Sequence, residues 1–382
     1  MAVSYLTKTE LDHFVQHNGN IEAGVRSALI DSLEQSGVFH DTDDSTRGWL
    51  QSGPFSGGPV PPVIQILDVS QSTNVQTNPN LKAIILDDHS AKLDVNGGDN
   101  DIFVAAGRGS DTINLHDSGN DTVYGGSGND EIRGGHGDSS LFGGAGNDSI
   151  FGGTGNDTLD GGAGNDYLVS GAVASGAGGG GQPHDANQRV ASADNQVFGK
   201  GNGHGDDHGK GHGNDHGKGH GNGHGHGHGH GHGDDQGSGQ GPGGGGDQGS
   251  GGNVQGHSTL LGGAGNDTLV GVQGDVMQGG AGNDQFWLVD GGASGANSTL
   301  EGGAGNDTFH IQTHHGNDTI FGGAGKDTVD FTGRSFFDVD KIGVDSSTNT
   351  YTLHFSDDQT IAVSGVEDLH FSDQIVTLPK LS

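Results

Sequence analysis

A nine-residue pattern recurs through the middle of the chain and constrains its fold more than any other feature. The pattern is G-G-x-G-x-D-x-U-x, where U is a large apolar residue. Its complete copies begin at Gly125, Gly143, Gly152, Gly161, Gly262, Gly279, Gly302 and Gly322. Degenerate copies begin at Asn96, Ala106, His116 and Thr313. Tandem units of this kind indicate a solenoid in which each repeat stacks on its neighbours, and their number argues against a flexible glycine linker.

Each position of the pattern has a physical role. Glycines permit tight turns with positive φ and let backbone carbonyl groups crowd round an ion. The Asp at position six supplies a hard carboxylate oxygen, which suits Ca²⁺. The x-U-x triplet predicts a very short strand with one inward side chain, such as Ile132, Ile150 or Leu168. One apolar residue per repeat is too small a core to order the coils, so bound ions are expected to supply part of the stability.

Composition agrees with a fold that depends on cations. Only 28% of the 382 residues are hydrophobic, and 49 Asp and Glu against 15 Lys and Arg give a formal net charge of −34. Such a chain repels itself, so it is either disordered or requires cations to fold. The charge has the wrong sign for a nucleic-acid partner. Because the chain has no Cys, disulfides and thiolate metal sites are excluded.

These repeats resemble those of the RTX family, the hemolysin-type calcium-binding nonapeptide repeat proteins. The resemblance covers about residues 96–330, apart from a long insertion. It implies an all-β fold, a right-handed parallel β-roll in which two nonapeptides form one turn. It also implies that each Ca²⁺ lies between the turn of one nonapeptide and the turn two nonapeptides on.

Applied to this sequence, that arrangement divides the position-six residues between two edges of the roll. One edge has an unbroken series: Asp111, Asp130, Asp148, Asp166, Asp267, Asp284, Asp307 and Asp327. The other edge offers the candidate ligands Asp101, Asp121, Asp157 and Asp318, interrupted by Ser139, Ser258, a shortened half-turn near Asp275, and Ser298. We therefore expect one filled column of Ca²⁺ and one sparse or empty column. Because the alternation keeps its phase across the insertion, both repeat blocks are expected to form one continuous roll.

The insertion is a low-complexity segment rich in Gly and His, with no apolar periodicity, and is expected to be flexible. Its regularly spaced histidines are His204, His208, His212, His216, His220, His224, His226, His228, His230 and His232. Imidazole suits Zn²⁺, Cu²⁺ or Ni²⁺, so one interpretation is transition-metal binding. The alternative is a soluble spacer.

The two ends lie outside the repeat pattern. Apolar residues at Ile21, Val25, Leu29 and Leu33 predict a helix, and segments 63–69 and 81–86 read as strands that lead into the first coil and seal its open end. The C-terminal segment is β-rich and resembles the segment that follows the repeats in RTX proteins, which implies an uncleaved signal for type I secretion. The N-terminus lacks the features of a cleavable signal peptide. The expected divisions are 1–95 for the N-terminal α/β cap, 96–169 for the first half of the roll, 170–256 for the insertion, 257–330 for the second half of the roll, and 331–382 for the C-terminal cap with the secretion signal.

Motifs of the common catalytic domains are missing from the sequence. It contains no H-E-x-x-H helix, no G-x-S-x-G elbow and no phosphate-binding G-x-x-x-x-G-K-[ST] loop. We therefore interpret the chain as a non-catalytic calcium-binding protein, extracellular or attached to the surface of a Gram-negative bacterium. It would serve in a surface, matrix or adhesion role, with calcium ions as ligands, an ABC-type exporter as the partner during secretion, and no membrane span. Two alternatives stay open: a transition-metal-binding protein that uses the His-rich loop, and a calcium-dependent self-assembling filament or layer subunit.

Overall fold

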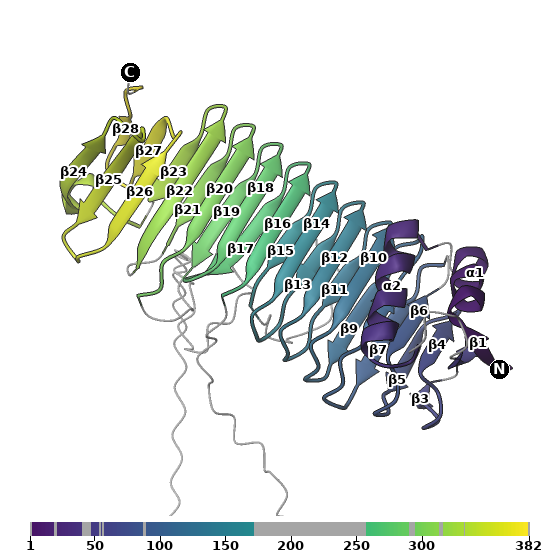
Figure 1. Cartoon of the computed structure of the whole chain (residues 1–382). Helices are drawn as coiled ribbons and strands as arrows, with labels where there is room; N and C mark the ends of the chain where they lie inside the picture. The colour runs from purple at the N-terminus through teal and green to yellow at the C-terminus, as the bar shows by residue number, and fades with distance from the viewer. Residues whose placement is uncertain are drawn as a thin grey trace, which may run out of the picture. The chain divides into compact units, whose positions relative to one another are not determined.

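The chain winds between two long β-sheets, with two helices near its N-terminus (Figure 1). A computed structural model describes residues 2–18, 21–39, 47–52, 55, 57–86, 89–171, 257–289, 295–312, 316–331 and 333–380. Within these residues the predicted all-β parallel roll is confirmed. The His-rich tract, with all ten histidines of the transition-metal interpretation, lies outside the described residues.

The first sheet has 15 strands. In spatial order they are β1 (Ala2–Thr7), β2 (Arg47–Ser52), β4 (Ile66–Val69), β6 (Ala83–Leu86), β8 (Phe103–Ala105), β10 (Thr122–Ser127), β12 (Ser140–Ala145), β14 (Thr158–Ala163), β16 (Thr259–Ala264), β18 (Val276–Ala281), β20 (Thr299–Ala304), β22 (Asn317–Ala324), β26 (Thr360–Ser364), β25 (Thr350–Phe355) and β24 (Val339–Asp345). From β2 to β26 the strands are parallel, so this part of the sheet is built by successive coils.

The second sheet has 13 strands and faces the first. In spatial order they are β28 (Ile375–Thr377), β27 (Asp368–Phe371), β23 (Thr328–Phe331), β21 (Thr308–Ile311), β19 (Gln285–Val289), β17 (Thr268–Val272), β15 (Tyr167–Val169), β13 (Ser149–Phe151), β11 (Glu131–Arg133), β9 (Thr112–His116), β7 (Lys92–Asn96), β5 (Thr73–Gln76) and β3 (Gly58–Pro59). The alternation of sheets along the chain means that each coil contributes one strand to each sheet.

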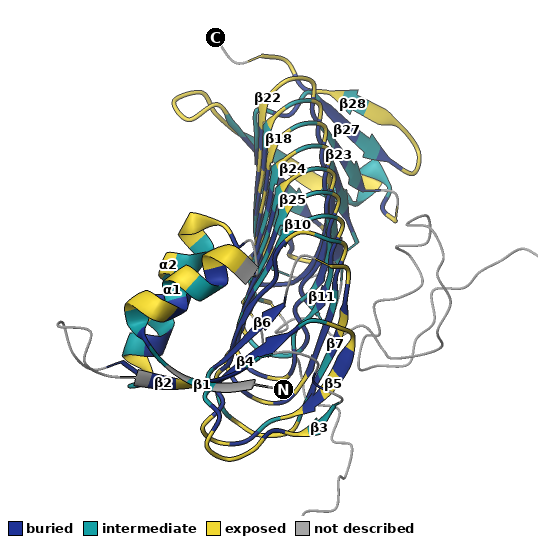
Figure 2. Cartoon of the chain, turned by 90° about the vertical axis from the view of Figure 1, so that its right-hand side faces the viewer, coloured by how far each residue is buried: buried dark blue, intermediate teal, exposed yellow. Residues whose placement is uncertain are grey.

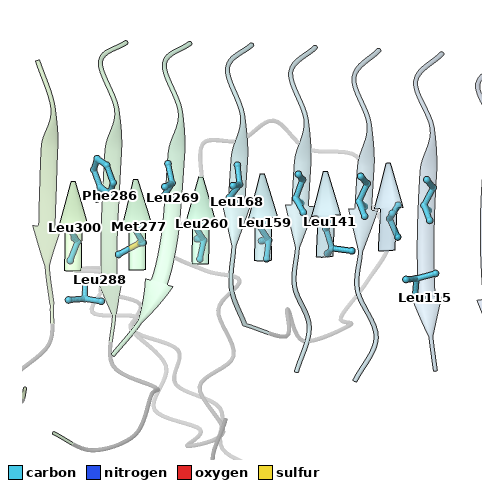
Figure 3. Packing of buried hydrophobic residues seen from close by; sticks show 14 of the residues in the cluster. Leu115, Leu141, Leu159, Leu168, Leu260, Leu269, Met277, Phe286, Leu288 and Leu300 are labelled. Carbon is cyan, nitrogen blue, oxygen red and sulfur yellow. The ribbon is translucent and has the colours of Figure 1, made fainter. Parts of the chain in front are cut away.

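The core between the sheets consists of the inward residues of the x-U-x triplets, stacked in rows (Figure 3). Leu141, Leu159 and Leu260 come from the first sheet and are fully buried. Leu168 and Leu269 come from the second sheet and are buried to the same extent. Each sheet contributes one row of these side chains, because the neighbouring residues of each triplet point outward.

The coils stack so closely at their turns that only glycine fits. Gly265 has a φ of 143°, and a Cβ built there would overlap the carbonyl oxygen of Gly164 in the preceding coil. The repeated glycines are therefore required by steric fit as well as by backbone conformation.

The two repeat blocks form one roll across residues 172–256. Thr158 of β14 pairs with Thr259 of β16, and Tyr167 of β15 pairs with Thr268 of β17. Both pairs keep the parallel register found elsewhere in the sheets. The insertion therefore leaves from a turn between strands and leaves the strand pairing unchanged.

The parallel ladders begin before the repeat block. In the first sheet, β2, β4 and β6 stack ahead of β8, and in the second, β3, β5 and β7 stack ahead of β9. The segments 63–69 and 81–86, expected as capping strands, thus contribute β4 and β6 to the coils themselves. The run Ala83–Leu86 is wholly buried because its inward residues meet the core and its outward residues meet the helices.

Helices α1 (Lys8–Asn18) and α2 (Ala23–Gln35) lie against the outer face of the first sheet (Figures 1 and 2). The predicted helix over 21–33 is present, although it begins at Ala23. The buried helical side chains pack with outward residues of β4, β6 and β8: Leu11, Val15, Leu29, Ile30 and Leu33 with Ile66, Ile85 and Phe103. Among the described residues, neither helix is long and apolar enough to span a membrane.

The C-terminal segment adds one further coil and caps it with antiparallel strands. β26 and β27 extend the two parallel ladders, whereas β24, β25 and β28 pair antiparallel at the end of the sheets. A short 3₁₀ helix, Phe336–Asp338, leads into this cap. The Arg334 guanidinium donates to Oδ2 of Asp357 at 2.6 Å and lies 4.3 Å from the centre of the Phe355 ring, so it ties the cap together.

Candidate metal site

The predicted Asp ladder lies at the edge where each coil passes from the first sheet to the second; we call this the first edge. Asp130 directly precedes β11, and Asp148 directly precedes β13. The motif explains this placement, because the two glycines at positions one and two end a strand and position six precedes the next triplet. All eight predicted residues of this edge are buried, between 0 and 3% exposed.

One carboxylate oxygen of each ladder residue stabilises the stack. The backbone N–H of Asp130 donates to Oδ1 of Asp148 at 2.8 Å, one coil further along. The same contact joins consecutive members of the series Asp111, Asp130, Asp148, Asp166, Asp267, Asp284, Asp307 and Asp327. At the C-terminal end of the series, the N–H of Asp327 donates to Oε2 of Glu367 at 2.9 Å. The Oδ1 atoms therefore have a structural role.

The second carboxylate oxygen has no such partner. Among the described residues, the Oδ2 atoms of seven ladder residues are buried without a hydrogen bond: Asp130, Asp148, Asp166, Asp267, Asp284, Asp307 and Asp327. A buried acceptor without a donor is costly, and a charged one is more so. One such atom in each successive coil indicates a ligand that this edge is built to hold.

Backbone carbonyl groups converge on the same place. A Cβ built on Gly262 would lie 2.5 Å from Oδ2 of Asp267 and 2.6 Å from the carbonyl oxygen of Gly279 in the next coil. A Cβ built on Gly125 would likewise lie 2.6 Å from Oδ2 of Asp130 and 2.7 Å from the carbonyl oxygen of Gly143. The missing side chain at position one therefore keeps open a small space lined by one carboxylate and one carbonyl oxygen.

The raised pKa values of the ladder aspartates show that their ionised forms are unfavourable without a nearby positive charge. The pKa of Asp130 is raised to about 7, mainly by burial and in part by the neighbouring carboxylates Asp148 and Asp111. Burial is also the main cause that raises the pKa to about 6 at Asp148, Asp166, Asp267, Asp284 and Asp327. A cation in the column would reverse this effect by favouring the ionised carboxylates.

Calcium fits this donor set. Carboxylate and carbonyl oxygens are the ligands that Ca²⁺ prefers, at about 2.3–2.6 Å, and it tolerates irregular geometry. Within the described residues no three His, Cys, Asp or Glu side chains converge on one point. Each ion would therefore be held by a carboxylate together with backbone oxygens of stacked turns, rather than by a cage of side chains.

The opposite edge, where coils return from the second sheet to the first, differs in the chemistry of position six; we call it the second edge. Ser139 accepts a hydrogen bond from the N–H of Asp121 through Oγ, and Ser258 accepts one from Asp157. Serine thus replaces the structural oxygen of Asp but offers no second oxygen. A Cβ built on Gly134 would contact the carbonyl oxygen of Gly152, as at the position-one glycines of the first edge. No carboxylate oxygen is among the atoms nearest to it.

The aspartates of the second edge fall into two groups. Asp275 accepts from the N–H groups of Ser258 and Val272, and Asp318 accepts from the N–H of Ser298, so these carboxylates are engaged within the protein. By contrast, Oδ2 of Asp121 and of Asp157 is buried without a hydrogen bond among the described residues. The second edge therefore keeps the ligand geometry at isolated places only.

Asp101 does not lie where the sequence predicted. It is exposed, and its Oδ1 accepts from the N–H of Asn120, which is the contact that position-five residues make. Ile102 occupies the ladder position instead, and its N–H donates to Oδ1 of Asp121. The register moves by one residue because Ile102 and Val104 both point into the core, while Phe103 points outward beneath the helices.

Glu367 is a member of the first-edge series that the sequence analysis did not identify. It lies two residues before the buried Leu369, which is the spacing between position six and U in the repeat. That spacing and Gly365 at position four were the available signals, but the segment lacks the glycines at positions one and two.

Comparison with known families identifies the repeats. Residues 117–150, 142–173, 243–275, 261–291, 293–310 and 311–333 match a family described as RTX calcium-binding nonapeptide repeat (4 copies). The chain contains RTX calcium-binding nonapeptide repeats. No curated protein matches it at a significant level. Calcium is thus the expected ligand of the RTX roll, in agreement with the orphaned carboxylate oxygens along its first edge.

Proposed function

We propose that this RTX protein is a secreted, non-catalytic roll that folds when calcium fills the first edge. The observation that carries the proposal is the series of seven buried Oδ2 atoms, one in each successive coil from Asp130 to Asp327. Neutralising these carboxylates removes the main obstacle to stacking the coils. In calcium-poor cytosol the chain, with its net charge of −34, would stay unfolded, and it would fold outside the cell where calcium is abundant.

The ligands in this proposal are the Asp residues of the first edge, with Asp121 and Asp157 as isolated ligands on the second edge. The carbonyl oxygens of the position-one glycines would complete each shell. We place Asp101 outside the ligand set because it is exposed, and Asp318 outside it because its carboxylate is engaged in the cap. The second column would then be sparse.

The biological role that fits is a surface, matrix or adhesion component exported through an ABC-type channel by a C-terminal signal. The large repeat domain and the absence of common catalytic motifs support a structural role. Transition-metal binding by the His-rich tract and calcium-dependent self-assembly remain alternatives, and the same experiment addresses the second of them.

The test is a calcium titration of the metal-free chain, followed by far-ultraviolet circular dichroism and by light scattering. We expect a cooperative gain of β signal with no change in particle size. Growth into large particles would favour the self-assembling subunit. If saturating calcium produced no change in β signal, the proposal would be wrong.

A further inference from the structure

A second carboxylate enters one turn of the second edge at a place where the repeat has glycine. The degenerate copy that begins at His116 reads His-Asp-Ser-Gly-Asn-Asp, so Asp117 occupies position two. In the regular turns this position has a positive φ, as at Gly126 with 96°. Asp117 has no such φ, and neither does Gly135 at position two of the next turn on this edge, so the backbone here does not require glycine.

The side chain of Asp117 points into the protein. The residue is 3% exposed, and neither of its carboxylate oxygens has a hydrogen-bond partner among the described residues. Its carbonyl oxygen accepts from the N–H of His136, and a Cβ built on Gly135 would lie 3.1 Å from its Oδ1. The carboxylate therefore lies at the junction of two stacked turns, as the ladder residues do on the first edge.

Asp121 brings another unsatisfied oxygen to the same turn. It is 1% exposed; its Oδ1 accepts from Ile102, and its Oδ2 is buried without a hydrogen bond. The two carboxyl groups are within hydrogen-bonding reach of each other. No described Lys or Arg forms an ion pair with either residue.

Three buried carboxylate oxygens thus meet with no donor to satisfy them. Two adjacent carboxylates repel each other when both are ionised, and burial strengthens that repulsion. A hard divalent cation between them would satisfy all three oxygens at once. A regular ladder turn contributes only one such oxygen, so this turn is the most carboxylate-rich place in the described second edge.

We propose that Asp117 and Asp121 jointly bind one divalent cation of the calcium type on the second edge, in a two-carboxylate site that the nonapeptide pattern does not encode. The site lies in the turn between β9 and β10 and faces the turn between β11 and β12. It rests on the calcium-folded roll proposed above, because the stacked turns must be present to form it.

The experiment measures calcium binding to the full chain by equilibrium dialysis over a range of calcium concentrations. It compares the unchanged protein with Asp117→Gly, which restores the motif residue, and with Asp117→Asn, which keeps the shape of the side chain. We expect both variants to keep the calcium-induced circular dichroism signal and to bind fewer ions at sub-saturating calcium, because Asp121 alone holds the ion of this turn more weakly. An unchanged binding curve in the folded variants would overturn the inference and indicate a proton shared by the two carboxyl groups.

A parallel variant separates this inference from the proposed function. Asp267→Asn removes a carboxylate from the first edge and is expected to lower the ion count whether or not Asp117 binds calcium. If Asp267→Asn loses calcium and the Asp117 variants do not, only the second-edge site is wrong. If the unchanged protein binds no calcium, the proposed function itself fails.

Discussion

The backbone N–H of Asp166 donates a hydrogen bond to Oδ1 of Asp267 at 2.7 Å, although 101 residues separate the two in sequence. The equivalent bond between Asp148 and Asp166 is 2.8 Å long and spans 18 residues. The first edge is therefore continuous past the insertion. The reason is that the insertion leaves the coil at the second edge, between Ser170 and Ser258, where it does not interrupt the carboxylate series.

Replacing Asp267 by Asn tests whether one carboxylate oxygen stabilises the stack while the other binds calcium. Asn keeps an oxygen to accept from Asp166 but removes the charge and places an NH₂ group in the column. We expect the midpoint of calcium-induced folding to rise on the order of tenfold, the usual size for loss of one charged contact. The matched control is Asp101→Asn, which changes an exposed residue and should leave the midpoint unchanged. Equal effects of the two substitutions would contradict the ladder.

Gly262→Ala should close the space that the carboxylate and carbonyl oxygens share. The new methyl group would lie 2.5 Å from Oδ2 of Asp267, closer than van der Waals contact allows. We expect the calcium-loaded roll to lose about 1–3 kcal/mol of stability, typical of overpacking. Gly24→Ala, in a helix with no atom within 4 Å of the new Cβ, should instead be neutral or slightly stabilising. Thermal melts in calcium measure both.

Ser139→Asp should convert a serine turn of the second edge into a calcium site. The turn already has Gly134 at position one and the approaching carbonyl oxygen of Gly152, and it lacks only the carboxylate. We expect one additional bound ion per chain in equilibrium dialysis. Ser139→Asn supplies the same shape without the charge and should bind no additional ion. A gain with Asn, or none with Asp, would show that position six does not control occupancy.

Shortening the insertion tests whether it matters for folding. Replacing residues 171–257 by the four residues of 135–138 gives the turn the length found between β11 and β12. Because β14 and β16 pair directly, we expect calcium-induced folding to persist. Closing a shorter loop should stabilise the roll by at most about 2–3 kcal/mol. The check is circular dichroism with thermal melting in saturating calcium, and loss of the β signal would mean that the insertion is part of the folding unit.

Acidification should have opposite effects with and without calcium. The pKa of Asp130 is raised from 3.8 to about 7 and that of Asp148 to about 6, so the calcium-free fold binds these protons more tightly than the unfolded chain does. Protonation therefore stabilises the calcium-free roll fully below about pH 4, and this stabilisation is lost as the pH rises through 6 and 7. With calcium present, protons compete for the same oxygens.

The measurement is circular dichroism at pH 5 and pH 7.5, in chelator and in calcium. We expect more β signal at pH 5 in chelator, and a higher calcium midpoint at pH 5 than at pH 7.5. The Asp267→Asn chain, with one fewer titrating carboxyl group in the column, serves as the control and should respond less. A calcium-free chain that gains stability as the pH rises would contradict the burial of these groups.

Much of the site follows from the sequence because the repeat period is uniform. A two-repeat coil places every second position-six residue on the same edge, so Asp130 and Asp148 align without knowledge of any other contact. The same arithmetic carried across the insertion aligns Asp166 with Asp267. Strong periodicity made these contacts predictable although they are distant in sequence.

The register predicted from the sequence was wrong where the repeat is degenerate. At Asp101 the repeat has lost its glycine at position four, and the pattern allowed either Ile102 or Phe103 as the inward apolar residue. Tertiary packing decided between them, because the helices cover Phe103 on the outer face. The strands at 66–69 and 83–86 belong to the coils rather than to a separate cap, because they pair in parallel with each other and with β8.

The sequence by itself determined the fold class, the residues of the Asp ladder and the edge on which they lie, since these depend only on spacing and residue type along the chain. Only the tertiary structure decided that Oδ1 of Asp267 serves the stack while Oδ2 is left for a ligand, because the donor N–H belongs to the preceding coil. It likewise brought Asp117 against Asp121 in one turn. Whether a carboxylate oxygen accepts a hydrogen bond depends on residues one coil away. The repeat pattern in the sequence does not specify which of the two oxygens those residues engage.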